Sequence, residues 1–394
     1  MKLTVIAVLL FLSNITGFAQ ANNDSCTMEI SLLTCAPGAD LYSIFGHTAI
    51  RVRDARRGMD IIYNYGTFDD TDPLFYIHFT KGIMNYSLSA ETYDSFMMEY
   101  EYEHRPVMGQ VLNLDCAEKN RLYEALRKNT LEENRFYQYH FHTDNCTTRA
   151  ARIIESNTKD SLWYENILPQ RGPSYRDMIH EYLNPQRQYW SKFGIDMCLG
   201  MNLDSKPSNI QAIHFLPAYL FRGMDHAIEG NKRLVVEKQR LLSFPETKIP
   251  GNPFTPVVAF TVLLMLGILF YFLRNKKPLL IFDISFFSLI GMFGLLIAAL
   301  WLGRVDDVCR NNINIFWALP THLVAVFFIR KKAAWIKYYF LVTAVLGSIL
   351  LIGFPWWPQR MNAAVLPILG IILFRSYCLY LNRNYAEKNI VQGS

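Results

Sequence analysis

The pattern of hydrophobic and polar residues divides the chain into two unlike parts. From residue 22 to residue 250, short alternating segments are bounded by glycine, proline and charged residues. From residue 254 onward, long apolar runs are separated by short polar breaks. The first pattern is typical of a domain in water and the second of a membrane domain. We therefore expect an aqueous domain at residues 22–250 and a membrane domain at residues 251–394.

The alternating segments predict a small antiparallel sheet. The candidate strands are TMEISLLTCAPG (27–38), LYSIFGHTAIRVRD (41–54), IIYNYGTF (61–68) and VMGQVLNL (107–114). The charged break DARRGMD between the second and third strands has the composition of a hairpin turn. Residues 73–100 are rich in aromatic side chains, and we predict that this region is partly helical.

Helical spacing of apolar residues follows capping residues. Asp115 precedes CAEKNRLYEALRKN, which predicts a capped helix that ends near Asn129. The run RFYQYHFHTDNC (135–146) is predicted to be extended and to lead into a helix at its final cysteine. SYRDMIHEYL (174–183) and FLPAYLFRGMDHAI (215–228) predict amphipathic helices that cover the sheet or contact lipid. The aqueous domain is therefore predicted to be α+β.

Five apolar runs in the second part are each close to the roughly 20 residues that a membrane-spanning helix needs. They lie at residues 256–273, 279–302, 313–329, 334–354 and 363–381. If the first run enters from outside, the basic clusters at 274–277 and 330–332 lie in the cytoplasm, as the positive-inside rule requires. We therefore predict a five-helix transmembrane domain whose C-terminus is cytoplasmic.

The first 21 residues have the features of a secretory signal peptide. One lysine precedes an apolar core from Leu3 to Leu12, and the small-residue ending Ala19-Gln20-Ala21 predicts cleavage near Ala21. An uncleaved anchor is the alternative, but the apolar core is short for a membrane span. Either way, the domain that follows is exported. We expect a multi-pass protein of the bacterial inner membrane with its N-terminal domain in the periplasm.

The cysteine count does not identify a reactive thiol. The chain has seven cysteines: Cys26, Cys35, Cys116, Cys146, Cys198, Cys309 and Cys378. Export places the first six in an oxidising compartment, where either complete pairing or a free thiol fits that number. A bridge between Cys26 and Cys35 is one candidate. The net charge of +5 comes from basic clusters between apolar runs, so we expect no nucleic-acid partner.

Several ionisable residues lie in or beside the apolar runs. Asp283 and Arg375 fall near cytoplasmic ends, where extension of the side chain to the interface is the simplest interpretation. His322 lies two residues after Pro320 and is expected to hydrogen-bond to backbone that a kink leaves unpaired; a position facing a lipid-binding groove is the alternative. The outer loop with Arg304, Asp306, Asp307 and Arg310 is a better candidate for contact with a lipid headgroup, although solvated loop charge explains it too.

The sequence contains a candidate thiol–imidazole pair. Cys146 follows Asp144 and Asn145, both helix-capping residues, so its thiol is predicted to lie in the first turn of a helix. The positive end of the helix dipole stabilises a thiolate and lowers the pKa of the cysteine. His47 opens a predicted strand in FGHTAIRV and is a suitable base. Such a pair transfers acyl groups through a thioester.

Thiol catalysis also needs a group that orients the base and a donor for the oxyanion. We expect the backbone N–H of Cys146 to be one oxyanion donor. Asn64 in IIYNYGTF is the candidate for the orienting residue. Tyr63 and Tyr65 compete with it, because a shift of one residue along a strand reverses the face of a side chain.

Two further histidines compete with His47 in the prediction. His140 and His142 are nearer to Cys146 in sequence, and an extended HxH segment points both rings to one face. They are alternative bases or metal ligands, but the sequence shows no convincing third ligand. We therefore expect neither a metal nor a cofactor.

The order of these motifs resembles known families. A histidine on an early strand followed by Asn-Cys at a helix start resembles the permuted papain-like (NlpC/P60-like) fold of lecithin–retinol acyltransferase and its relatives. FGHTAIRV, NYGTF, DNCTTR and the five-run tail are more closely similar to the Lnb family of lipoprotein N-acyltransferases. The resemblance implies transfer of an acyl chain from a membrane phospholipid to the α-amine of a diacylglyceryl-cysteine lipoprotein. It also implies His47 as base and Cys146 as nucleophile.

Two other classes of function are compatible with the same residues. A membrane-tethered thiol hydrolase of the cell envelope, either a peptidase or an amidase, would use the same pair. A non-catalytic lipid-handling or scaffold protein would hold Cys146 in a disulfide. Several predicted spans and a short linker favour lipid substrates, because a hydrolase of soluble substrates needs at most one anchoring span. A phospholipid donor, a diacylated lipoprotein acceptor and the membrane are therefore the expected partners.

Overall fold

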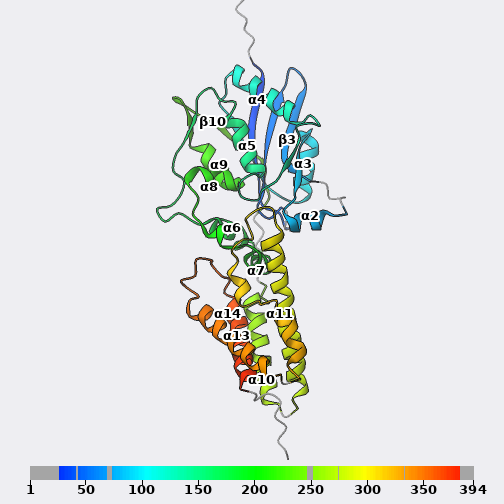
Figure 1. The fold of residues 1–394 in the computed structure, drawn as a ribbon. Coiled ribbons are helices and arrows are strands. Elements are labelled where there is room, and N and C mark those ends of the chain that lie inside the picture. Colours follow the sequence, from blue (N-terminus) through cyan, green and yellow to red (C-terminus); the bar gives the residue numbers. More distant parts are fainter. Residues whose placement is uncertain are drawn as a thin grey trace, which may run out of the picture.

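A computed structural model describes residues 26–40, 43–68, 73–245, 252–273, 275–331 and 333–381. A sheet domain stands on a region of long helices, and the two are joined by a narrow neck (Figure 1). This mixed α/β domain followed by a helical region agrees with the sequence prediction. The predicted signal peptide and the basic residues beyond the last apolar run lie outside the described residues.

The main sheet is antiparallel and has seven strands in the order β10-β5-β1-β2-β3-β4-β6. The strands are β1 (Met28–Cys35), β2 (His47–Asp54), β3 (Met59–Thr67), β4 (Asn85–Thr92), β5 (Val107–Leu112), β6 (Phe136–Gln138) and β10 (Val235–Leu242). A second sheet contains β7 (Leu162–Tyr164), β8 (Ala227–Glu229) and β9 (Lys232–Arg233). The main sheet is larger than predicted, because β4 lies in a region expected to be partly helical and β10 lies outside the predicted strands.

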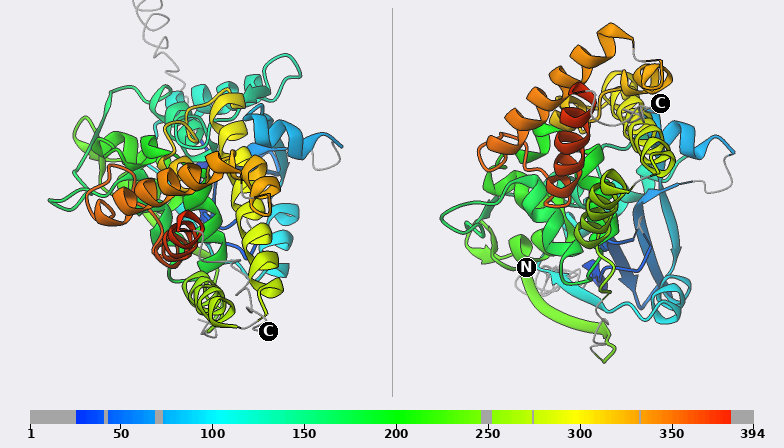
Figure 2. Two further views of the ribbon diagram at one scale, coloured as in Figure 1. Left: turned by 60° about the horizontal axis from the view of Figure 1, so that its bottom comes forward. Right: turned by 90° about the horizontal axis from the view of Figure 1, so that it is seen from below.

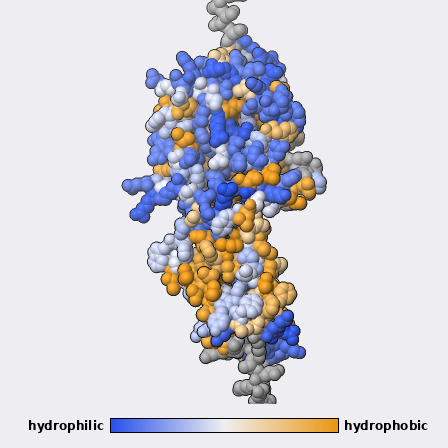
Figure 3. All heavy atoms as spheres, in the orientation of Figure 1, coloured by the Kyte–Doolittle hydropathy of each residue, from blue (hydrophilic) through white to orange (hydrophobic). Residues whose placement is uncertain are grey.

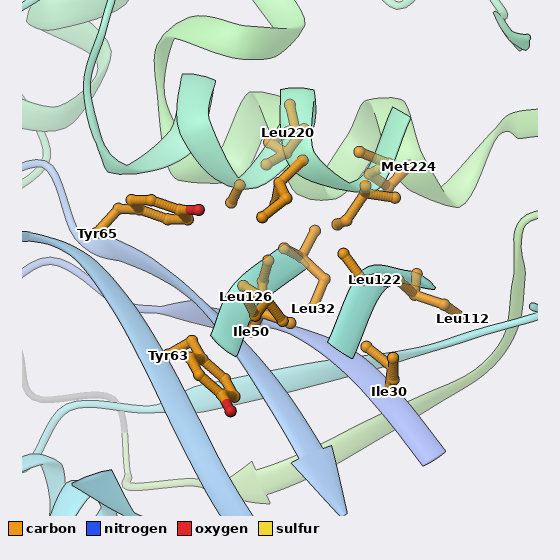
Figure 4. Packing of buried hydrophobic residues seen from close by; sticks show 14 of the residues in the cluster. Ile30, Leu32, Ile50, Tyr63, Tyr65, Leu112, Leu122, Leu126, Leu220 and Met224 are labelled. Atoms are coloured by element: carbon orange, nitrogen blue, oxygen red, sulfur yellow. The ribbon is translucent and has the colours of Figure 1, made fainter. Parts of the chain in front are cut away.

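Helices cover both faces of the central strands. One face packs against α4 (Cys116–Asn129), α5 (Cys146–Glu155), α8 (Asn209–Phe215) and α9 (Pro217–Asp225). On that face Leu32 and Ile50 meet Leu122 of α4 and Leu220 of α9 (Figure 4). The opposite face packs against α3 (Tyr93–Tyr102). Successive residues of the central strands therefore enter two separate cores.

The first predicted helix cap is confirmed. Asp115 precedes α4, and its side chain accepts a hydrogen bond from the backbone N–H of Glu118 at 2.8 Å. The Glu118 carboxylate in turn accepts from the backbone N–H of Asp115 at 2.7 Å. This reciprocal capping box satisfies two donors that the first turn of a helix otherwise leaves without partners.

The helical region contains four apolar helices longer than 15 residues among the described residues. They are α10 (Pro256–Phe272), α11 (Lys277–Gly303), α13 (Ala334–Ile352) and α14 (Val365–Tyr380). By length and composition α11 and α13 are able to cross a membrane, and α10 and α14 are shorter apolar helices. Seen from below, α14 stands between α13 and α10, and apolar side chains cover this half of the surface (Figures 2 and 3).

The third apolar run, residues 313–329, is not one continuous helix. It is divided into η2 (Ile313–Phe316), α12 (His322–Ala325) and η3 (Val326–Phe328). Pro320 lies between the first two pieces and lacks the N–H that helix continuation requires. The His322 ring contacts the Tyr339 hydroxyl at 2.8 Å, and it also has the expected backbone partner, at Trp317. Five membrane spans therefore stay a prediction.

The interpretation of Asp283 and Arg375 as residues that extend to the interface is wrong. Both side chains are fully buried, and they form a bidentate pair between α11 and α14 with N–O distances of 2.7 and 2.8 Å. The two oppositely charged groups satisfy each other inside the apolar region, so neither side chain has to reach water.

The neck consists of α2 (Phe75–Lys81), α6 (Tyr175–Leu183), α7 (Tyr189–Cys198), η1 (Met201–Asp204) and the outer loop after α11. The Gly200 N–H donates to the Val308 carbonyl at 2.8 Å, and Asn312 Nδ2 donates to the Met197 carbonyl at 2.8 Å. Backbone and side-chain bonds thus join the two parts of the chain.

The predicted headgroup loop has a different role in the structure. Arg304 is buried and pairs with Asp306, with Nε and Oδ1 2.7 Å apart. Arg304 Nη1 also donates to the Phe79 carbonyl of α2 at 2.7 Å. These two charges are used inside the protein, where they fix the loop to the sheet domain. The structure therefore favours an internal clamp over contact with a headgroup at Arg304.

Candidate active site

The second predicted helix begins at the predicted position. Asn145 is the N-cap of α5, and its side chain accepts a hydrogen bond from the backbone N–H of Thr148 at 2.9 Å. Its Nδ2 donates to the carbonyls of Phe141 and Phe215 at 2.8 and 2.9 Å. The cap bond and the bond to Phe141 are local to the helix start, whereas the bond to Phe215 ties it to α8; together they place Cys146 in the first turn of α5. The thiol side chain is half-buried.

Asp144 does not cap the helix directly. Its carboxylate accepts two hydrogen bonds from the guanidinium of Arg149, at 2.9 and 2.7 Å, and contacts Arg152 at 3.4 Å. The Arg149 guanidinium also lies 3.6 Å from the ring centroid of Tyr137 on β6. The motif DNCTTR is therefore a clamp that holds the turn before the cysteine against its own helix.

β2 brings His47 to the start of α5. His47 is the first residue of the strand, and the next residue, Thr48, contacts Thr147 of α5 with the two hydroxyl oxygens 3.2 Å apart. The β2–β3 pairing ends at Ile50 and Tyr63, and Gly66 follows three residues later on β3. Gly66 has φ of 92°, and a Cβ there would lie 3.5 Å from the Cβ of Cys146. A residue without a side chain leaves this space to the thiol.

A chain of hydrogen bonds fixes the orientation of the His47 ring. Asn64 Nδ2 donates to Glu91 Oε1 at 2.8 Å, and Asn64 Oδ1 lies 3.2 Å from His47 Nε2. A carboxylate only accepts, so the amide nitrogen must face Glu91 and the amide oxygen must face the ring. His47 Nε2 therefore carries a proton that it donates to Asn64. In neutral His47 the lone pair is at Nδ1.

The two catalytic candidates change each other's pKa. Burial alone would raise the pKa of the Cys146 thiol, but the positive charge of His47, a hydrogen bond from its ring and the Thr48 backbone N–H lower it below its usual value. Burial alone would lower the pKa of His47, but the hydrogen bond to Cys146, its negative charge and the bond to Asn64 raise it. These shifts favour a thiolate–imidazolium pair.

The structure separates the competing residues from this pair. Tyr63 and Tyr65 lie on the face of β3 opposite Asn64, in the core that Cys146 also borders, and the Tyr65 hydroxyl accepts a hydrogen bond from Asn129 at 2.9 Å. His142 Nε2 lies 4.0 Å from Asp307 Oδ1, and its ring packs against Tyr175. The segment 139–145 is a turn rather than an extended strand, with a β-bridge between His140 and Asp144. The expected shared face of the two HxH rings therefore does not form as predicted.

Aromatic side chains form one wall beside the thiol. Tyr139 Cε2 lies 3.8 Å from the Cβ position at Gly66, next to Cys146. Tyr86 of β4 packs against Tyr139 with ring centroids 4.6 Å apart, and Phe68 packs against Tyr86 at 5.3 Å. Such a wall suits an apolar substrate group, because the aromatic rings exclude water.

The candidate bridge between Cys26 and Cys35 is wrong. Neither thiol is part of a disulfide bond. Cys26 packs against the core under α4 and Cys35 against the core under α3, so they lie on opposite faces of the sheet. Strand β1 also separates them by more than about 20 Å, whereas a disulfide needs Cα atoms within about 7 Å.

Sequence reasoning missed Glu91, Gly66 and the Thr48 backbone N–H as parts of this cluster. Glu91 lies on β4, which was not predicted, so nothing in the sequence placed it beside Asn64. Gly66 carried a signal, since a glycine inside a strand often marks close approach of another group. In the part of the chain that the structure describes, no three His, Cys, Asp or Glu side chains form a group able to bind a metal.

Comparison with protein families gives two matches. The family model of the Lnb N-terminal periplasmic domain matches residues 16–171, which include His47, Asn64 and Cys146. The model of the Lnb transmembrane domain matches residues 247–387. No curated protein and no solved structure matches the chain. The two family domains occur in this order and cover most of the sequence, which identifies a membrane protein with a periplasmic N-terminal domain, and the chain belongs to the Lnb family.

Proposed function

We propose that this protein transfers an acyl chain from a membrane phospholipid to the α-amine of a diacylglyceryl-cysteine lipoprotein, through a thioester on Cys146. The observation that carries the proposal is the cluster of Cys146, His47 and Asn64, in which the pKa of the thiol is lowered. Its setting agrees with lipid chemistry, because the sheet domain is joined by a short neck to a region of apolar helices. Membership of the Lnb family supports a membrane enzyme of lipoprotein maturation.

The proposed reaction has two steps that use the same residues. The Cys146 thiolate attacks an ester carbonyl of the phospholipid, a C–S bond forms and the ester C–O bond breaks. Protonated His47 gives its proton to the departing glycerol oxygen, which releases a lysophospholipid. The backbone N–H of Cys146 at the helix start is the proposed donor to the oxyanion.

In the second step the lipoprotein α-amine attacks the thioester. A C–N bond forms, the C–S bond breaks and the Cys146 thiolate is released, while His47 takes the proton from the attacking nitrogen. Asn64 is proposed to orient the ring in both steps, since its amide holds the Nε2 side and leaves Nδ1 toward the thiol. An amine acceptor requires no metal or cofactor in this scheme.

The proposal includes the fold and topology expected from the sequence. The histidine strand precedes the cysteine helix in the chain, which is the order of the permuted papain-like arrangement. We propose that residues 22–250 form the periplasmic domain after cleavage of residues 1–21. We further propose that residues 251–394 cross the inner membrane five times and end in the cytoplasm. The charge distribution between the apolar runs supports this topology.

Mass spectrometry of lipoproteins from cells that depend on this protein tests the function. Cys146→Ala should leave lipoproteins diacylated with a free α-amine, because no thioester forms. Cys116→Ser is the matched control, since that thiol lies beside Cys26 at the start of α4 and outside the cluster of Cys146, His47 and Asn64. Normal triacylated lipoproteins in the Cys146→Ala strain would refute the proposed reaction.

A further inference from the structure

Helix α2 exposes an unusual amount of apolar surface for its size. It has seven residues, and the exposed fractions of Leu74, Ile77, Phe79 and Ile83 in and beside it are 48%, 50%, 47% and 41%. A helix this short is not stable in water through its own hydrogen bonds, and packing normally stabilises it. Adjacent exposed apolar side chains on a protein surface mark a site of interaction.

The structure fixes α2 to the outer end of α11. Arg304 Nη1 donates to the Phe79 carbonyl at 2.7 Å, and the Val305 N–H donates to the Lys81 carbonyl at 3.0 Å. Gly82, with φ of 71°, ends the helix where a Cβ would lie 3.0 Å from Asp306 Oδ2. The position of α2 therefore follows from that of a helix long and apolar enough to cross a membrane.

The apolar surface of α11 continues onto α2. Leu302 and Val305 at the end of α11 are 83% and 56% exposed. α2 projects sideways from the neck, and apolar residues cover the surface at this level (Figures 1 and 3). We call the six side chains Leu74, Ile77, Phe79, Ile83, Leu302 and Val305 the apolar ridge. The ridge lies at one end of a membrane-spanning candidate, which is where the headgroup region of a bilayer would be.

The ridge is connected directly to the candidate active site. Ile83 is followed by Met84, whose carbonyl accepts from the Tyr139 N–H at 2.8 Å, and then by β4. Three residues after Ile83, Tyr86 packs against Tyr139 in the aromatic wall beside Cys146. The segment from Ile83 to Tyr86 thus has one apolar side chain in the ridge at the neck and another in the aromatic wall beside Cys146.

We propose that the apolar ridge is embedded in the outer leaflet of the membrane, where it contacts phospholipid acyl chains and leads one of them to Cys146. The ridge is continuous with the apolar surface of α11, the helix long enough to cross a membrane. The group that covers α11 should therefore cover the ridge as well, and that group is lipid. Lys81, exposed at the end of α2, is placed to meet lipid phosphates. The embedding is independent of the chemistry at Cys146, whereas the delivery of an acyl chain rests on the proposed function.

The embedding is tested with a bimane label on Ile77→Cys in the full chain, in nanodiscs of phosphatidylethanolamine and phosphatidylglycerol. A Cys116→Ser/Cys146→Ala background removes the exposed and the reactive thiol. Treating this background with bimane, without the new cysteine, measures how much label reacts with the remaining cysteines. We expect nitroxide-bearing lipids to quench the label and aqueous iodide to leave it largely unaffected. Quenching by iodide, with no effect of the nitroxide lipids, would overturn the proposal.

Two control positions give the limits of this measurement. Val236→Cys on β10 is 60% exposed and lies in the sheet domain, so iodide should quench a label there. Val262→Cys on α10 is 53% exposed in the apolar region, so nitroxide lipids should quench that label. A label at position 77 that is protected from both quenchers would indicate cover by a second protein, and would also overturn the proposal.

The delivery of the acyl chain is tested in the catalytically intact protein. Ile77→Ser/Ile83→Ser should lower acyl transfer from bilayer phospholipid about tenfold. This is the change expected when the lost apolar contacts weaken the binding of the acyl chain about tenfold. Alkylation of Cys146 by soluble iodoacetamide should be unchanged, and Val236→Ser should alter neither rate. Full transfer activity in the double variant would overturn delivery, whereas retained activity in Cys146→Ala would instead refute the proposed function.

Discussion

At the scale of single residues, the central feature is that His47 and Cys146 stabilise each other's charged form. Burial opposes both charges, and the mutual hydrogen bond, the Asn64 amide and the Thr48 N–H offset it. Both shifts increase the share of the thiolate–imidazolium pair, since one lowers the pKa of the thiol and the other raises that of the imidazole. The pair is lost at low pH when the thiolate gains a proton, and at high pH when the imidazolium loses one.

The pH dependence of Cys146 alkylation tests this pairing. In the native protein the rate should rise with its half-point below pH 9.0, the ordinary value for a thiol. In His47→Gln, burial remains without the positive charge, so the half-point should move above that value. Iodoacetamide labelling followed by peptide mass spectrometry measures both profiles. Identical half-points in the two proteins would show that His47 does not act on the thiol.

Glu91 is expected to act as a positioning residue through Asn64. Glu91→Leu removes the acceptor of the Asn64 amide, so the amide can turn and the ring loses its fixed orientation. We expect kcat to fall about tenfold with KM for phospholipid unchanged, the pattern of a lost transition-state interaction. Glu91→Gln retains an acceptor oxygen and should recover most of the rate. An equal loss in both variants would contradict this role.

At the scale of secondary-structure elements, the sequence predicted those elements whose signals are local. Asp115 and Asn145 are capping residues followed by helical spacing, and α4 and α5 start directly after them. β1, β2 and β3 alternate and were predicted, because each has a local period of two. The start of α5 and the start of β2 fix Cys146 and His47, so the candidate pair was predictable.

Elements that depend on distant partners were not predicted. The sequence of β4, NYSLSAET, does alternate polar and apolar residues, but it lies inside the aromatic-rich region predicted to be partly helical, and the strand pairs with β3 and β6. β10, with the sequence VVEKQRLL, has no regular alternation and joins the edge of the sheet beside β5. Glu91 could not be assigned for this reason. The third apolar run looked continuous, but Pro320 divides it in the structure.

We expect the Asn145 cap of α5 to contribute more to the free energy of unfolding than a typical helix cap does. Asn145→Ala removes the bond to the Thr148 N–H and two bonds to carbonyls, all in a buried position. The loss should exceed the ~1 kcal/mol of an exposed cap, and acyl transfer should fall because the thiol moves. Ser208→Ala, which removes the exposed cap of α8, is the control. Thermal unfolding of the two variants measures the difference, and equal melting temperatures would contradict it.

At the scale of the whole molecule, a small number of buried contacts join the sheet domain to the membrane domain. Arg304 and Asp306 form a pair that also holds α2 through the Phe79 carbonyl. In the proposed function, these contacts hold the candidate active site at a fixed height above the bilayer. The same contacts hold α2, which carries most of the apolar ridge, at the end of α11.

Removing one member of this buried pair should destabilise the junction more than removing both. Arg304→Met leaves the Asp306 carboxylate buried without its partner, a change that costs about 3–5 kcal/mol in buried pairs. Arg304→Met/Asp306→Met leaves no unpaired charge and should unfold at a higher temperature than the single variant. Calorimetry of the full chain in detergent measures both. A double variant less stable than the single one would show that the pair is not an internal clamp.

The central claim is that Cys146 carries the acyl chain during transfer. Intact-protein mass spectrometry after incubation with phospholipid and no lipoprotein acceptor tests it directly. We predict a mass increase equal to one fatty acyl group, mapped to Cys146, released by hydroxylamine and discharged when a lipoprotein with a free α-amine is added. The adduct should be absent in Cys146→Ala. Transfer of an acyl chain by a protein that forms no adduct at Cys146 would contradict the account.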